Sequence, residues 1–379
     1  MGGHDARMTT AFAAPARPPM TATRLAAIDA ARGLAVLGMI TAHVGALRDP
    51  AWTDPGSWLS IASGRSSILF ATLAGVSIAL LSGRRQPPVG SELVRVRLRI
   101  LVRALALFAL GGLLTMLGTG IPVILQTYAL LFACCLPFLT WPPRRLLILA
   151  AGWAVIAPPV TVWLAQWLPS SCDAASPECS GAQVTDLAIT GAYPGLVWIT
   201  FAFVGLALGR CDLAAQAVRV RMVAAGLSMM VAGYGGAWLL SQFDTSEPSE
   251  WTPLRTAEPH SGSTFEIVGS VGFALTLIGV LLLTANLLRP ILFPVIAVGT
   301  LPLTVYSAHF VAIWLLGESS TEPSGNTLLM VFLAVTIAAS TLWVLVVGRG
   351  PLERGVTWLT TRATSGRAET TAHDIGQTA

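Results

Sequence analysis

The chain alternates long apolar runs with short polar segments along its whole length. Each run has roughly the 20 residues that an α-helix needs to cross about 30 Å of hydrocarbon. The pattern therefore predicts an all-α, polytopic integral membrane protein with about ten transmembrane helices. The ten runs lie at roughly 28–47, 66–82, 100–118, 122–140, 146–168, 194–209, 222–241, 264–285, 292–315 and 326–347.

Composition supports this fold class. Hydrophobic residues make up 54% of the 379 residues and charged residues only 11%, whereas soluble domains carry about 25% charged residues. The mean hydropathy is +0.69. A soluble protein is thereby excluded.

The distribution of arginine predicts the orientation. Every basic side chain is an arginine, and with the N-terminus inside, all of them except Arg48, Arg65 and Arg255 fall on the cytoplasmic side. This is the bias of the positive-inside rule, and it predicts that both termini are cytoplasmic in a plasma (inner) membrane. The net charge of +4 is explained by the arginines that orient the helices in the membrane. We therefore expect membrane lipids and not nucleic acid as partners.

The segments outside the predicted spans include two polar tails and two segments on the outer side. Residues 1–23 and 363–379 are predicted to be disordered cytoplasmic tails around a single transmembrane domain at 24–362. Cys172 and Cys179 enclose a short outer segment, where oxidation is permitted, and predict a structural disulfide. The acidic segment 242–263 either caps an outward-facing cavity or is a solvated connector.

The first predicted span carries a polar stripe. His43 follows Arg32 by eleven residues and Asp29 precedes Arg32 by three, so all three share one helical face. The arginine and the histidine would then be separated by roughly 16 Å along the axis. Ionisable side chains at membrane depth are rare and indicate a functional site.

A second histidine lies at similar depth. His309 falls in the outer half of the ninth predicted span, so it could approach His43. A neutral imidazole can act as a general base or be acylated as a nucleophile. Tyr306 shares the face of His309 and could orient its ring or stabilise an oxyanion. Alternatively, the histidines only hold two helices together and the tyrosine is interfacial.

Three charged residues are candidates for substrate binding. Guanidinium groups pair with phosphate in a bidentate manner, so Arg32 near the inner surface could contact a cytoplasmic acyl-CoA. Asp29 belongs to that site or only forms an ion pair with Arg32. Arg65, on the outer side, either binds an anionic acceptor or anchors the second span. No cysteine or histidine spacing predicts a metal site.

Four segments resemble known membrane families. Residues 24–43 (RLAAIDAARGLAVLGMITAH) and 68–77 (ILFATLAGVS) look like the first two helices of the heparan-α-glucosaminide N-acetyltransferase-like family. The arginine–ten residues–histidine spacing is similar to that of the acyltransferase type 3 membrane proteins. Residues 299–309 and 349–354 resemble the YeiB-like family of unknown function.

The resemblance implies an activity. Transmembrane acyltransferases of this kind move an acyl group from cytoplasmic acyl-CoA to an acceptor on the far side, often a sugar. It implies acetyl-CoA or another acyl-CoA as donor, without a metal, and a glycan or envelope lipid as acceptor. By resemblance, His43 is the catalytic residue and Arg32 its partner on the donor path.

We therefore predict a membrane acyltransferase in which His43, His309 and Tyr306 act at the reacting centre. Two alternatives remain. One is a proton-coupled transporter or flippase of a small molecule or lipid-linked glycan, with the histidines relaying protons. The other is a non-catalytic partner of an envelope enzyme. The sequence leaves open the acceptor, the acyl chain and the oligomeric state, including a homodimer.

Overall fold

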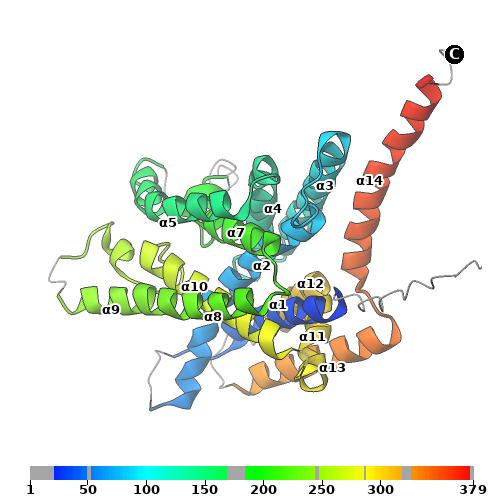
Figure 1. The fold of residues 1–379 in the computed structure, drawn as a ribbon. Helices are drawn as coiled ribbons and strands as arrows, with labels where there is room; N and C mark the ends of the chain where they lie inside the picture. The colour runs from blue at the N-terminus through cyan, green and yellow to red at the C-terminus, as the bar shows by residue number, and fades with distance from the viewer. Residues whose placement is uncertain are drawn as a thin grey trace, which may run out of the picture.

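All secondary structure elements of the described chain are helices or helical turns (Figure 1). The computed structural model describes residues 21–48, 53–168, 184–243, 247–285, 287–317 and 326–375. The all-α prediction is confirmed for these residues. The predicted Cys172–Cys179 disulfide lies outside them.

Seven helices or helix pairs among the described residues are long and apolar enough to cross a membrane, which confirms a multi-pass membrane protein. Five of them are single helices. The other two are a 3-10 turn that runs into α2 and a helix, α8, that continues through a π-turn into α9. They are α1 (Thr21–Val44), η1–α2 (Pro55–Ala62 and Arg65–Leu81), α3 (Gly90–Thr115), α5 (Pro143–Ala165), α8–α9 (Gln216–Met230 and Gly236–Ser241), α10 (Thr264–Thr284) and α13 (Thr327–Val346).

The remaining apolar runs form shorter or broken helices. The fourth and sixth predicted spans are the short helices α4 (Leu125–Cys134) and α7 (Gly195–Arg210). The ninth is the bent pair α11 (Arg289–Thr300) and α12 (Pro302–Leu316). Counted as one span, this pair is the eighth candidate. The total of ten spans and the orientation of the termini stay predictions.

A proline breaks the ninth span. The axes of α11 and α12 differ by 74°, because Pro302 cannot donate a hydrogen bond to the preceding turn and disfavours helical backbone at the residue before it. Leu301 accordingly leaves the helical conformation, with φ −119° and ψ 34°. The helix α12, which carries Tyr306 and His309, therefore begins inside the protein.

Glycines let α1 approach α11 closely. A Cβ atom on Gly299 would overlap the carbonyl oxygen of Asp29, and one on Gly33 would overlap that of Val295. Small residues of this kind allow helix backbones to meet in membranes. The contact holds α1 against the first half of the broken span.

Replacing Gly299 by alanine is expected to destabilise the protein by about 1–3 kcal/mol, the usual cost of overpacking. The added methyl group would meet backbone, which cannot rotate away. Thermal unfolding in detergent measures the effect. Gly152→Ala is the control, since a Cβ there meets nothing within 4 Å. Equal melting temperatures for Gly299→Ala and the unsubstituted protein would contradict this packing.

The C-terminal helix α14 (Pro351–Ile375) packs against α3 and α12 (Figure 1). It runs through the domain boundary predicted at 362, and α1 begins at Thr21, slightly before the boundary predicted at 24. The domain division stays a prediction.

Candidate functional site

Two histidines from distant parts of the chain meet inside the bundle. Nδ1 of His43 on α1 lies 3.0 Å from Nε2 of His309 on α12. The rings are stacked, with centroids 5.3 Å apart and planes inclined by 22°. His309 is only 4% exposed, and His43 is partly buried. The predicted approach of the two side chains is confirmed.

The surroundings of the pair are largely aromatic. Phe310 contacts the edge of His43 at 5.6 Å between centroids, and Tyr306 contacts His309 at 5.1 Å. The Tyr306 hydroxyl accepts a hydrogen bond of 3.2 Å from the backbone N–H of Ile124. Tyr306 thus touches the His309 ring through its own ring, while its hydroxyl faces the start of α4.

The second ring nitrogen of His309, Nδ1, does not contact His43. Its Nδ1 lies near the carbonyl groups of Val305 and Tyr306, but it makes no well-aligned hydrogen bond with any described residue. An N–H at this position points toward backbone oxygen, which leaves Nε2 as an acceptor. In that tautomer, the bond between the two rings runs from the Nδ1–H of His43 to Nε2 of His309.

Asp29 and Arg32 form the ion pair that their spacing predicts. Arg32 Nη1 donates to Asp29 Oδ1 at 2.7 Å. Its Nη2 donates to Ser77 Oγ on α2 at 2.8 Å. Two helices thus hold the guanidinium in one orientation, eleven residues before His43.

A cavity of about 490 Å³ opens beside this ion pair. Its lining includes three arginines and two acids, together with Tyr306, which contacts His309. We call it the inner cavity, because the predicted orientation puts it on the cytoplasmic side. Its charged residues are Asp29, Arg32, Arg103, Arg349 and Glu353, and its larger apolar residues include Phe70, Leu73, Leu107, Tyr128 and Phe132.

Sequence reasoning missed three of these charged residues. Arg103 lies within the third predicted span. An arginine at membrane depth indicates a functional site there for the same reason as Arg32 does. Arg349 and Glu353 belong to the segment 349–354, and family resemblance was the only signal in that segment. Nothing local in the sequence indicated that the start of α14 reaches the inner cavity.

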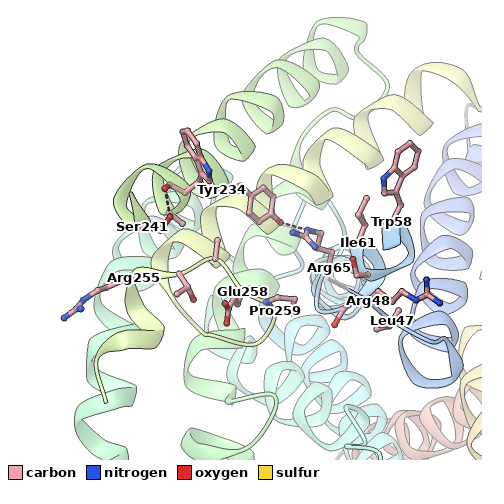
Figure 2. A pocket seen from close by; sticks show the side chains of 16 residues that line it. Leu47, Arg48, Trp58, Ile61, Arg65, Tyr234, Ser241, Arg255, Glu258 and Pro259 are labelled. Carbon is pink, nitrogen blue, oxygen red and sulfur yellow. Dashed lines mark hydrogen bonds between the residues drawn. The ribbon is translucent and has the colours of Figure 1, made fainter. Parts of the chain in front are cut away.

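A larger cavity, of about 1180 Å³, lies toward the other ends of α1 and α2 (Figure 2). We call it the outer cavity. Arg65 donates from Nε to the Tyr234 hydroxyl at 3.0 Å and lies over that ring at 4.7 Å. Arg48 and Trp58 line the cavity beside it. Arg65 is therefore separate from the Asp29–Arg32 pair, at the opposite end of α2 from Ser77.

The loop that closes one side of the outer cavity is held by a buried carboxylate. Glu266 is 5% exposed and accepts hydrogen bonds of 2.7 Å from the backbone N–H groups of His260 and Gly262. Residues 255–259 of this loop line the cavity. These residues of the 242–263 segment thus border a cavity, whereas the outward orientation of that cavity stays a prediction.

One more histidine follows the residues that line the outer cavity. His260 has a left-handed backbone, with φ 64°, and its ring packs against Tyr193 and Trp198. Within the described part of the chain, no cluster of three or more histidine, cysteine or acidic side chains has the geometry to hold a metal ion.

One protein-family model matches the chain over the region that contains much of the candidate site. The model for the catalytic region of heparan-alpha-glucosaminide N-acetyltransferase matches residues 24–243, which include Asp29, Arg32, His43 and Arg65. No curated protein matches the chain. The resemblance of the first two helices is confirmed, whereas the likeness to the acyltransferase type 3 and YeiB-like families stays a prediction. Since more than half of its length is matched, the chain belongs to the heparan-alpha-glucosaminide N-acetyltransferase catalytic family.

Proposed function

We propose that the protein transfers an acetyl or other small acyl group from cytoplasmic acyl-CoA to a hydroxyl or amine on the far side of the plasma membrane. The observation that carries this is the hydrogen-bonded pair of His43 and His309. Along the chain, His43 comes between Arg32, which lines the inner cavity, and Leu47, which lines the outer cavity just after the end of α1. A base at this place could serve substrates that arrive from opposite sides.

The inner cavity suits an acyl-CoA donor. The guanidinium groups of Arg32, Arg103 and Arg349 complement the phosphates of CoA, and the apolar wall suits an acyl-pantetheine arm. Asp29 and Ser77 orient Arg32 for such contacts.

The histidine pair suits general base catalysis. If the Nδ1–H of His43 donates to Nε2 of His309, then Nε2 of His43 holds a lone pair. It removes the proton of the acceptor hydroxyl or amine as that group attacks the thioester carbonyl. The tetrahedral intermediate collapses with cleavage of the C–S bond, and the CoA thiolate takes the proton from the imidazolium. In the other course, His43 itself carries the acyl group between the two substrates.

Tyr306 separates the donor site from the pair. Neither histidine lines either cavity, whereas Tyr306, which contacts His309, lines the inner one. Transfer at His43 therefore requires the Tyr306 side chain or α12 to shift when the donor is bound. In its new position the Tyr306 hydroxyl could also donate to the developing oxyanion.

The outer cavity suits the acceptor. Arg48, Arg65 and Glu258 offer charged groups, and Trp58 and Trp238 offer flat apolar surfaces for a sugar or lipid headgroup. We propose an envelope glycan or lipid as the acceptor, with Arg65 among its contacts. A homodimer and bound membrane lipids are compatible with this arrangement.

The test uses purified protein in liposomes, with labelled acetyl-CoA on one side and cell-envelope glycans or lipids on the other. The expected result is release of CoA together with label on the acceptor. Acetyl-CoA should also stabilise the protein by about 2.7 kcal/mol at a hundredfold excess over its dissociation constant. Substrate movement driven by a proton gradient without release of CoA would overturn the proposal in favour of a transporter.

A further inference from the structure

The C-terminal helix contributes one carboxylate to the start of α12. Glu353 Oε1 accepts hydrogen bonds from the backbone N–H groups of Leu303 at 2.8 Å and Thr304 at 3.0 Å. Its Oε2 accepts a bond of 2.5 Å from the Thr304 hydroxyl. The backbone N–H of Leu352 approaches the same hydroxyl at 3.4 Å. Both carboxylate oxygens are thus engaged with the first turn of α12.

The broken span explains why α12 needs this carboxylate. The first N–H groups of any helix have no partner within the helix, and here they lie inside a membrane protein, where water does not easily replace one. Leu301, in the capping position, offers no polar side chain. A negative charge at a helix N-terminus is also favoured by the helix dipole. Glu353 therefore supplies, from about fifty residues away, the cap that the local sequence lacks.

This cap lies close to both parts of the candidate site. Tyr306 and His309 follow Leu303 by one and nearly two turns of the same helix, so the first turn sets where the His309 ring points. The Glu353 carboxylate also lines the inner cavity, together with Arg349 of its own segment. Arg103 lines the same cavity.

We propose that Glu353 is a positioning residue that holds α12 so that His309 meets His43, and that it links this position to filling of the inner cavity. An anionic group bound by Arg103 and Arg349 would lie beside the carboxylate and alter its hold on α12. The catalytic part of this inference rests on the proposed acyl transfer, whereas the structural part does not.

The direct test is hydrogen exchange of the segment 302–310 in the purified full-length protein. In Glu353→Gln, which lacks one acceptor and the charge, exchange in this segment is expected to be about tenfold faster than in the unsubstituted protein, with α1 and α10 unchanged. Adding CoA should change exchange in this segment in the unsubstituted protein, and much less in the variant. Thr304→Val, which removes only the hydroxyl contact, should give a smaller change of the same kind.

Activity gives the second measurement. Glu353→Gln is expected to lower kcat by about tenfold to a hundredfold, because small misplacement of a catalytic group has effects of that size, with a smaller change in KM for acyl-CoA. Glu92→Gln, an exposed carboxylate in the first turn of α3, is the matched control and should change neither quantity.

Several results would overturn the inference. Unchanged exchange at 302–310 in both variants, or faster exchange throughout the protein, would show that Glu353 does not hold α12 specifically. A CoA effect on exchange of equal size with and without the carboxylate would remove the link to the inner cavity. If exchange changes locally as expected but the protein never transfers an acyl group, the role of Glu353 as a cap of α12 is supported. Only the proposed function is then contradicted.

Discussion

Replacing His43 by alanine is expected to reduce acyl transfer by about 10²–10⁴-fold, the usual contribution of a general base. His43 contacts His309 through Nδ1, so its Nε2 remains to act as the base. If it carries the acyl group instead, the loss should be at least as large. Release of CoA from acetyl-CoA by the purified variant measures the effect. Binding of CoA should be kept, since Arg32 lies roughly 16 Å away.

Two further variants serve as the comparison and the control for His43→Ala. They are His309→Ala and His373→Ala, the latter in the C-terminal tail. His309→Ala should lower kcat less than His43→Ala does, because it removes only the partner that orients the base. His373→Ala changes a histidine far along the chain from the pair and should leave activity unchanged. Acyl transfer by His43→Ala at the normal rate would end the role assigned to this residue. Trapping a labelled acyl-protein that forms in the unsubstituted protein and not in His43→Ala would distinguish the carrier from the base.

Replacing Arg32 by alanine is expected to raise KM for acyl-CoA by roughly tenfold to 150-fold, equivalent to the 1.5–3 kcal/mol of a hydrogen bond to a charged group. Arg32→Lys should recover only part of this, because an ammonium group cannot make two parallel bonds to phosphate. The measurement is the dependence of the initial rate on acyl-CoA concentration, together with CoA binding by thermal shift.

The ion pair with Asp29 requires a control for stability. Removing Arg32 alone leaves the Asp29 carboxylate without its partner, so that variant is expected to melt at a lower temperature. The double variant Asp29→Asn, Arg32→Gln removes both charges and should recover much of the stability but not the donor affinity. Arg144→Ala, at an exposed arginine, should change neither. Recovered donor binding in the double variant would show that Arg32 acts only through folding.

Much of the site could be inferred from sequence because its parts lie on single helices. Helical geometry puts Asp29, Arg32 and His43 on one face whatever the rest of the fold does. Hydropathy also predicts depth, and similar depth was enough to suggest that His43 and His309 approach each other. The aromatic contacts of the pair and the separation of Arg65 from Arg32 depend on how helices are packed, which periodicity does not reveal.

Local chemistry, read from the sequence alone, determined that this chain is an all-helical membrane protein, where its apolar helices lie, and which polar groups are placed within them. These properties depend on hydrophobic length and helical periodicity, which act over tens of consecutive residues. Only the tertiary structure decided that α11 and α12 meet at a sharp bend, that two cavities lie at opposite ends of α1, and that Glu353 caps α12. Those features arise from contacts between residues far apart in the chain, and the partner of a buried polar group is chosen by packing and not by its neighbours in sequence.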